Sequence, residues 1–200
     1  MAKDDRTNVM RLLASAGIAF TDHIYDPEET DGEEVAKLVG KSALETFKTL
    51  VTQAASGKNY VFVIPVHLEL DLKAAARAVG EKSIEMIPQK KLMPLTGYVH
   101  GGCSPVGLKR SFPVVFDESC LALSEMTLSA GKRGRQVSVR PKDLISYVGL
   151  ISLLFTLSCS FNQHVSTFAL FPNLISLVNE SPMIRVFLSS KFSISFFTIL

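Results

Sequence analysis

The stretch LETFKTLVTQAASGKNYVFVIPV, residues 44–66, is the main determinant of the predicted fold. Its first part, residues 44–52, is rich in the β-branched and aromatic side chains that favour strands. Residues 60–66 form a continuous apolar run, and the intervening SGKN at 56–59 has the composition of a turn. The stretch therefore predicts a β-hairpin whose second strand is fully buried.

Helices and short strands alternate around this hairpin. Helices are predicted where a capping residue precedes apolar positions at helical spacing: after Thr7 or Asn8, after Asp31 (with Glu34 completing a capping box), after Asp71, and from Pro141. Strands are predicted at 18–25, 113–116, 124–128 and 135–139. Because no regular strand–helix–strand period appears, we predict a mixed α+β fold, a curled, barrel-like sheet flanked by helices.

The 200 residues divide into two parts of different composition. All 12 glycines and 37 of the 40 charged residues lie in residues 1–150, whereas residues 151–200 hold 8 of the 13 phenylalanines and 10 serines. We therefore predict one domain over residues 1–150 and an atypical tail over 151–200.

The tail allows three interpretations. No Asp, Glu, Lys or Arg occurs from Leu144 to Asn179, which is long enough for a membrane span, but five Ser and Thr residues interrupt the apolar run at 144–161. Neither a Lys/Arg-rich flank nor an aromatic belt accompanies it. A Ser/Phe/Leu/Ile-rich segment without glycine is also typical of a frameshifted or misjoined end, or of a disordered one, so membrane contact is the less favoured interpretation.

Charge and cysteine content exclude several classes of protein. A net charge of +2 excludes a protein that holds nucleic acid by bulk charge. Three cysteines make no even disulfide framework, and no pair has metal-ligand spacing, so we expect neither a metal nor another cofactor. The polar N-terminus MAKDDRTNVM lacks the apolar region of a secretory signal, which predicts a cytoplasmic protein.

Three stretches could carry chemistry, each with a plain structural alternative. Lys48 could grip a phosphate or a carbonyl oxygen, or could be a solvent-facing strand residue. The glycines of GGCSPVG at 101–107 could bring main-chain N–H groups to an oxyanion, or could form an ordinary turn. The cations of SAGKRGR at 129–135 could follow a nucleic-acid backbone, or could lie at a solvated hairpin tip. Cys103 could be a nucleophile, or an ordinary loop residue.

Five motifs in order resemble one family. They are Tyr25 before an acidic loop, FKTLV at 47–51, LDLKAAARAVG at 70–80, TGYVHGGCSPVG at 96–107 and SAGKRGRQV at 129–137. Together they resemble the YbaK/EbsC family of aminoacyl-tRNA deacylases, which are relatives of the editing insertion of bacterial prolyl-tRNA synthetase. The resemblance extends from about Asn8 to about Gly149 and is strongest to the cysteinyl-tRNA(Pro) deacylase branch.

The resemblance implies a pocket that accepts the 3′ end of an aminoacyl-tRNA. It implies that Lys48 holds the terminal phosphate or ribose, with Gly101 and Gly102 around the aminoacyl carbonyl, and these three are the expected catalytic residues. The expected substrate-binding residues are Tyr25, Thr49, Ser104, Ser129, Gly131 and Gln136, and the expected tRNA-binding residues are Lys132, Arg133 and Arg135. Gln136 stands where some members carry Asp, so the rate or the amino-acid preference could differ.

The resemblance also implies a reaction without a protein nucleophile. In this branch the thiol of the substrate cysteine attacks its own ester carbonyl and expels tRNA(Pro) as a cyclic thiolactone forms, and prolyl-tRNA synthetase is a possible partner. Two alternatives stay open: a deacylase for another small amino acid, such as Ala-tRNA(Pro), and a non-catalytic module that binds tRNA or a synthetase.

Overall fold

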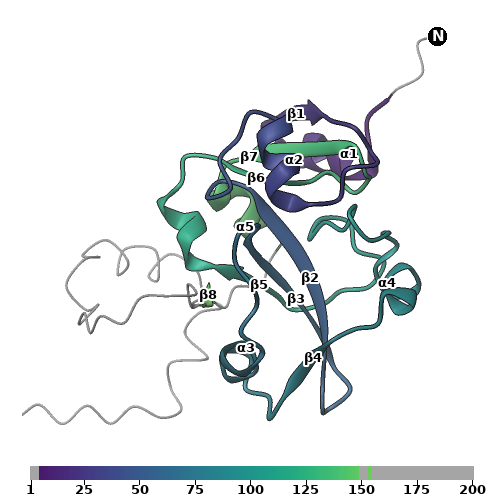
Figure 1. Ribbon diagram of the computed structural model, residues 1–200, viewed down its shortest axis with the longest axis vertical. Helices are drawn as coiled ribbons and strands as arrows, with labels where there is room; N and C mark the ends of the chain where they lie inside the picture. Colours follow the sequence, from purple (N-terminus) through teal and green to yellow (C-terminus); the bar gives the residue numbers. More distant parts are fainter. Residues whose placement is uncertain (1–4, 149–152, 155–200) are drawn as a thin grey trace, which may run out of the picture. The chain divides into compact units, whose positions relative to one another are not determined.

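The computed structural model describes residues 5–148 and 153–154 (Figure 1). Its helices are α1 (Asn8–Ser15), α2 (Gly32–Leu38), α3 (Leu72–Ala78), α4 (Gln89–Thr96), the 3₁₀ helix η1 (Glu118–Ala122) and α5 (Pro141–Val148). Its strands are β1 (Phe20–Ile24), β2 (Phe47–Ala54), β3 (Asn59–Pro65), β4 (Ile84–Met86), β5 (Val114–Asp117), β6 (Met126–Ser129), β7 (Arg135–Val139) and β8 (Leu153–Leu154). The mixed α+β class is confirmed.

The predicted hairpin is the centre of the larger sheet. β2 and β3 pair antiparallel from Phe47↔Pro65 to Gln53↔Asn59, and the sheet order is β4-β2-β3-β5-β8. β3 is buried along almost its whole length, because it lies between β2 and a parallel partner, β5. A second sheet has the order β1-β7-β6, with antiparallel pairs throughout.

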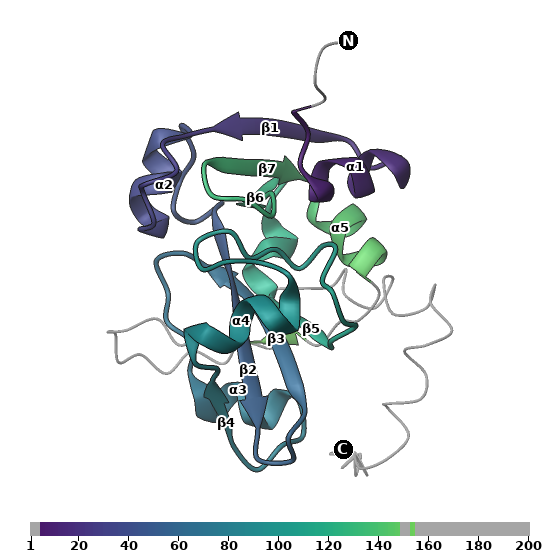
Figure 2. The same cartoon turned by 90° about the vertical axis from the view of Figure 1, so that its right-hand side faces the viewer.

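A parallel bridge joins the two sheets. It pairs Thr46, just before β2, with Thr127 in β6, and the Thr127 N–H donates to the Glu45 carbonyl at 2.7 Å. The chain that enters β2 therefore continues the smaller sheet, and Figure 2 shows β2 and β3 running away from β6 and β7 at a steep angle. This bridge produces the curled sheet that the sequence predicts.

Apolar side chains on the two faces of the hairpin form two cores. Val51, Val61 and Val63 face a core shared with α1, α5 and the second sheet. Phe62 and Ile64 point the other way and pack with Ala75 of α3. Both Phe62 and Ile64 have no exposed surface, and each contributes about 1.5–3 kcal/mol of burial free energy.

Three of the predicted helices begin at a residue whose side chain caps the first turn. Thr7 accepts from the Met10 N–H in α1, and Asp71 accepts from the N–H groups of Lys73 and Ala74 in α3. Asp31 likewise accepts from the first N–H groups of α2.

The capping box predicted for α2 is wrong in one half. The Asp31 N–H donates to Glu29 Oε1 at 2.8 Å rather than to Glu34. Glu34 instead forms an ion pair with Lys37 at 2.6 Å, since three residues along a helix places the two on the same side.

The boundary predicted at residue 150 falls in a part of the chain that the structure does not describe. Leu153–Leu154 form β8, which pairs parallel with Phe116 and Asp117 at the edge of β5. The other predictions about residues 151–200 lie outside the described residues. Within the described part of the chain, no helix is both long and apolar enough to cross a membrane.

Candidate active site

One face of the smaller sheet is polar, and the register places several predicted site residues on it. Gln136 pairs with His23 on one side and with Ser129 on the other. The parallel bridge at Thr46 and Thr127 brings β2 to the same sheet with the same face exposed, so Lys48, two residues further, lies on that face as well. The polar face consists of His23, Tyr25, Thr46, Lys48, Thr127, Ser129, Gln136 and Ser138.

The acidic loop and α2 lie close to this face. A Cβ at Gly32 would lie 2.9 Å from the Val66 side chain, so the first turn of α2 rests directly on the residue after β3. A Cβ at Gly101 would lie 3.5 Å from Thr30 Cγ2, so the glycine-rich loop meets the acidic loop as well. The first turn of α2, the acidic loop, the glycine-rich loop and the chain after β3 are therefore neighbours beside this face.

Lys48 is half-buried in β2, and its ammonium is partly satisfied. Nζ donates to the main-chain carbonyl of Val66 at 2.9 Å. Burial lowers the pKa of Lys48, and the nearby carboxylates of Glu69, Glu33 and Asp31 partly oppose that shift. An ammonium has three N–H donors, so two remain for a ligand.

Thr49 lies on the opposite face of β2 from Lys48. Adjacent strand residues alternate between faces, and Thr49 pairs with Val63, which belongs to the core beside the glycine-rich loop. Its Oγ1 is buried and has no hydrogen-bond partner among the described residues. The FKTLV motif therefore does not place Lys48 and Thr49 on one surface, although both are predicted site residues.

Gln136 carries the other unsatisfied buried oxygen. The side chain is 7% exposed, and Oε1 accepts no hydrogen bond from the residues that the structure describes. A buried polar atom without a partner costs about 1–3 kcal/mol. Such an atom on the same face as Lys48 indicates a position where a ligand donates a hydrogen bond.

A row of hydrogen-bonded side chains continues from Gln136. His23 Nε2 lies 2.8 Å from Ser138 Oγ, which in turn lies 2.7 Å from Thr127 Oγ1. Burial, and secondarily the charge of Lys41, lowers the pKa of His23, which favours the neutral ring. Sequence reasoning missed His23, although the predicted alternation over 18–25 places it on the same side of the strand as Tyr25.

The glycine-rich loop packs against the turn between β6 and β7. A Cβ at Gly102 would lie 3.2 Å from the main-chain nitrogen of Arg133, so the absence of a side chain at Gly102 lets the loop approach the turn closely. The Gly102 N–H already donates to the Val99 carbonyl at 3.0 Å. Ser104 is fully buried and its Oγ accepts from the Val106 N–H, which gives it a structural contact within the loop.

Tyr25 and Ser129 lie on either side of the start of β7, Tyr25 just after β1 and Ser129 at the end of β6. The Tyr25 N–H donates to the Gly134 carbonyl at 3.1 Å and the side chain is buried. Ser129 Oγ accepts from the Gly131 N–H. Gly131 has φ of +85°, and a Cβ there would lie 2.8 Å from both Tyr98 and Val9, so its role is to let the turn close.

Cys103 has the properties of a buried structural thiol. Its side chain is 8% exposed, and burial raises its pKa to about 12. Because the thiolate is the reactive form, this environment argues against the nucleophile alternative.

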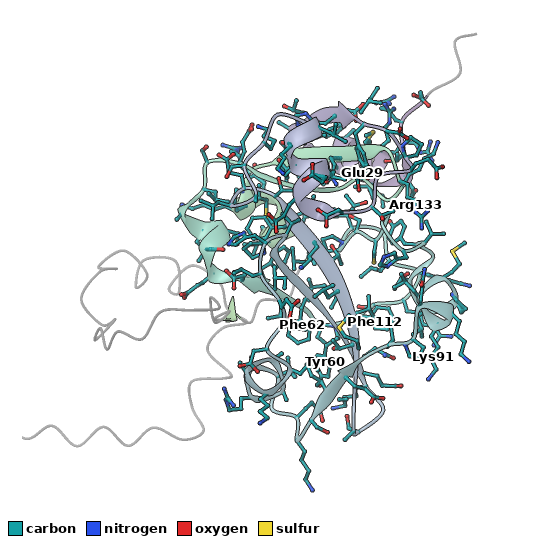
Figure 3. The ribbon with its side chains drawn as sticks, in the orientation of Figure 1. Glu29, Tyr60, Phe62, Lys91, Phe112 and Arg133 are labelled. Carbon is teal, nitrogen blue, oxygen red and sulfur yellow. The ribbon has the colours of Figure 1, made fainter. Side chains whose placement is uncertain are left out.

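The three predicted tRNA-binding cations differ in their surroundings. Lys132 is exposed. Arg133 Nε donates to the His100 carbonyl at 2.7 Å, and Figure 3 shows the side chain at the edge of the molecule near Glu29. Arg135 is held by Asp5 at 2.9 Å and by Asp22 at 3.3 Å, with its side chain 11% exposed. Arg135 is thus committed to ion pairs within the chain.

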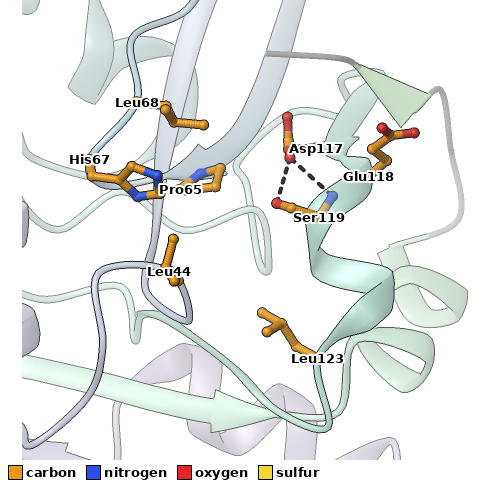
Figure 4. A pocket seen from close by; sticks show the side chains of 8 residues that line it. All are labelled: Leu44, Pro65, His67, Leu68, Asp117, Glu118, Ser119 and Leu123. Atoms are coloured by element: carbon orange, nitrogen blue, oxygen red, sulfur yellow. Dashed lines mark hydrogen bonds between the residues drawn. The ribbon is translucent and has the colours of Figure 1, made fainter. Parts of the chain in front are cut away.

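An open pocket of about 310 Å³ lies beside the chain that leaves β3 (Figure 4). Its lining residues are Leu44, Pro65, His67, Leu68, Asp117, Glu118, Ser119 and Leu123. None of the predicted site residues is among them. We place the candidate site on the polar face rather than in this pocket, because that face holds Lys48 and the unsatisfied oxygen of Gln136.

Comparisons with known proteins agree on one family. Residues 26–147 match the model of the aminoacyl-tRNA editing domain. A protein of Enterococcus faecalis named "Putative Cys-tRNA(Pro)/Cys-tRNA(Cys) deacylase EbsC" is 38% identical over 143 residues, which cover 70% of this chain and 87% of that protein.

Solved structures share the fold. A crystal structure of "a putative trans-editing enzyme for prolyl tRNA synthetase" is 27% identical with a TM-score of 0.63, covering 74% of this chain and 94% of that one. The crystal structure of the hypothetical protein APE2540 has a TM-score of 0.68 at 23% identity, covering 74% of this chain and 99% of that one, and shows likeness of fold.

Proposed function

The chain belongs to the aminoacyl-tRNA editing domain family, and from this membership we propose that it removes cysteine in trans from mischarged tRNA(Pro), and also from tRNA(Cys). The names of its relatives support this: one is a Cys-tRNA(Pro)/Cys-tRNA(Cys) deacylase by name, and the other is a trans-editing enzyme for prolyl tRNA synthetase by name. One observation supports the proposal for the site. The half-buried ammonium of Lys48 and the unsatisfied buried oxygen Gln136 Oε1 lie on the same polar face.

Each side chain then has a task set by its chemistry. The two free N–H donors of Lys48 bind the phosphate or the ester oxygen at the 3′ end, where negative charge resides or develops. Gln136 Oε1 accepts a hydrogen bond from the amino group of the cysteine. Tyr25 and Ser129 bound the polar face, and Gly101 lets the loop approach the aminoacyl carbonyl without a side chain in the way.

The chemical step uses the substrate's own thiol. The cysteine sulfur forms a bond to the ester carbonyl carbon, the carbon–oxygen bond to the ribose breaks, and the thiol proton ends on the ribose hydroxyl. The products are uncharged tRNA and a cyclic thiolactone. The protein holds the thiol and the ester in a fixed orientation and stabilises the charge that develops. Both effects raise the rate above that of the same reaction in the flexible ester free in solution.

A panel of charged tRNAs tests this proposal. The full chain is incubated with Cys-tRNA(Pro), Cys-tRNA(Cys), Ser-tRNA(Pro) and Ala-tRNA(Pro), and loss of the ester is followed against the rate without protein. Rapid loss of both cysteinyl substrates and slow loss of the seryl and alanyl esters is expected, because only cysteine carries a thiol. Equal rates for Ala-tRNA(Pro) would replace the thiol mechanism by attack of water, and no activity on any ester would refute the deacylase proposal.

Two further predictions accompany the proposal. Thiol-assisted cleavage does not itself distinguish tRNA(Pro) from tRNA(Cys), so selection of tRNA(Pro) would come from a partner, for which prolyl-tRNA synthetase is our candidate. Aminoacyl-tRNA is made and used in the cytoplasm, and we place the reaction there.

A further inference from the structure

A long stretch of the chain around the glycine-rich loop carries positive charge without any acid. From Met86 to Phe116 there is no Asp or Glu, whereas Lys90, Lys91, Lys109 and Arg110 all occur there. All four side chains are exposed. None of them forms an ion pair with any residue that the structure describes. The segment therefore carries a net charge of +4 in a chain whose net charge is +2.

The fold gathers these cations on one side of the molecule. Lys90 and Lys91 lie in the first turn of α4, and the Lys109 N–H donates to the carbonyl of Thr96 at the end of that helix. α4 has eight residues and is about 12 Å long. Figure 2 looks onto α4 and the loop that follows it, and Figure 3 shows Lys91 and Arg133 on that same side.

The acidic loop and the start of α2, beside the polar face, carry negative charge instead. Residues 26–34 hold six acids and no Lys or Arg: Asp26, Glu28, Glu29, Asp31, Glu33 and Glu34. Five of the six are exposed. A polyanion is repelled by this acidic segment and attracted by the cations of α4 and the 109–110 loop, so the charge distribution disfavours an approach over the acidic loop.

We propose that α4 and the Lys109–Arg110 loop bind the sugar–phosphate backbone of the tRNA acceptor stem and direct its 3′ end over the glycine-rich loop. This inference rests on the proposed function, since it names the surface that the same substrate uses. In this proposal the backbone contacts come from α4 and the 109–110 loop rather than from Arg135, whose charge Asp5 and Asp22 neutralise. The exposed Lys132 lies at the edge of the proposed surface.

RNA suits this surface better than a protein does. Its exposed side chains include the four cations, the neutral Gln89 and the apolar Met93 and Val99, and none of them is an aromatic anchor. Lysines and arginines that neutralise phosphates release counterions, which gives strong dependence on salt. A protein partner would instead be expected to contribute apolar contact area.

The test compares two sets of charge-removing variants in the full chain. The first set is Lys90→Gln, Lys91→Gln, Lys109→Gln and Arg110→Gln combined. The control is Lys73→Gln with Arg77→Gln, which removes two exposed cations from α3, and its effect is compared with that of the fourfold variant per cation removed. Single-turnover deacylation of Cys-tRNA(Pro) gives the half-saturating concentration and the maximal rate, and fluorescence anisotropy gives the affinity for uncharged tRNA(Pro) from 50 to 300 mM salt.

The fourfold variant should bind at least about tenfold more weakly at low salt. Its log affinity should also fall less steeply with log salt, by about 0.7–0.9 for each phosphate that the variant no longer neutralises. Its maximal rate should stay within about twofold of wild type, because the polar face is intact. An unchanged affinity and salt slope, or an effect per cation removed no larger than that of the α3 control, would overturn the proposal.

Two other results separate this inference from the proposed function. If wild type binds tRNA(Pro) with a salt slope that the fourfold variant flattens, but deacylates no ester, the surface stands and the deacylase proposal fails. If both proteins bind tRNA equally and the variant loses only its association with prolyl-tRNA synthetase, the surface binds protein and the RNA assignment is wrong.

Discussion

Lys48 Nζ donates to the main-chain carbonyl of Val66 at 2.9 Å, and the side chain of Val66 is the surface on which Gly32 of α2 rests. One residue therefore connects the ammonium in β2, the chain leaving β3 and the first turn of the helix beside the polar face. The hydrogen bond holds the long lysine side chain in place before a substrate binds, so less side-chain entropy is lost on binding.

Replacing Lys48 tests the central part of the site. Lys48→Ala removes the ammonium that would meet the phosphate or ester oxygen, and loss of one such donor typically costs about 10²–10³-fold in rate. We expect that loss in single-turnover deacylation of Cys-tRNA(Pro), with an unchanged circular dichroism spectrum. Lys58→Ala, in the exposed turn of the same hairpin, is the matched control and should keep wild-type activity.

The lowered pKa of Lys48 predicts an early loss of activity at alkaline pH. Burial disfavours the ammonium, so deprotonation occurs below the ordinary pKa of 10.5. The rate, corrected for uncatalysed ester loss, should fall on the alkaline side below that pH. Lys48→Arg should keep its charge and lack this alkaline limb, since a guanidinium does not deprotonate in this range. An alkaline limb at the same pH in the arginine variant would assign it to another group.

The lowered pKa of Lys48 also makes the stability of the protein depend on pH. A lysine whose folded pKa lies below its unfolded pKa binds fewer protons in the native state. The free energy of unfolding should therefore rise with pH between the folded pKa and 10.5, and this rise should disappear in Lys48→Met. Urea denaturation of both proteins across that range measures the difference.

Local features of the fold followed from the sequence because their causes are local. The turn at 56–59, the apolar run at 60–66 and the cap residues Thr7 and Asp71 each act within a few residues along the chain. The predicted strand at 44–52 begins later, at Phe47, because the chain before it makes the bridge from Thr46 to β6.

The composition of the polar face depends on pairings between distant segments. Tyr25, Lys48 and Gln136 were predicted by resemblance to a family, but that they share a face follows from the pairs His23↔Gln136 and Thr46↔Thr127. These join residues about 80 to 110 positions apart in sequence, and no periodicity within a strand encodes them. The same holds for the ion pairs of Arg135 with Asp5 and Asp22, two residues more than 100 positions away in sequence.

Gln136 should trade stability for activity. Gln136→Met keeps the length of the side chain and removes the buried oxygen without a partner, so the free energy of unfolding should rise by about 1 kcal/mol. Deacylation should fall at least tenfold, because the hydrogen bond to the substrate is lost. Gln53→Met is the control: its amide already donates to the Gly57 carbonyl, so that variant should gain no stability.

Cys103 should be dispensable for the reaction. A thiol with a pKa of about 12 is almost wholly protonated at neutral pH, so Cys103→Ala should deacylate Cys-tRNA(Pro) within about twofold of wild type. Peptide mapping after iodoacetamide at pH 8 should find Cys103 unlabelled in the native protein and labelled in urea, as for Cys120, which has no exposed surface. A loss of activity above tenfold with normal folding would restore the nucleophile alternative.

The contact between Gly32 and Val66 should control the position of α2 over the site. A Cβ at Gly32 would lie 2.9 Å from two atoms of the Val66 side chain, and a β-branched side chain has little freedom to move away. Gly32→Ala should therefore displace the start of α2 and lower catalytic efficiency about tenfold, although alanine favours helix more than glycine does by about 1 kcal/mol.

Val66→Ala opens the space that the new methyl group needs and leaves the main-chain carbonyl that Lys48 uses. The double variant Gly32→Ala/Val66→Ala should recover most of the lost efficiency, which gives a favourable coupling in a double-mutant cycle. Efficiencies that fall additively in the double variant would show that the two positions act independently, and α2 would then owe its place beside Lys48 to other contacts.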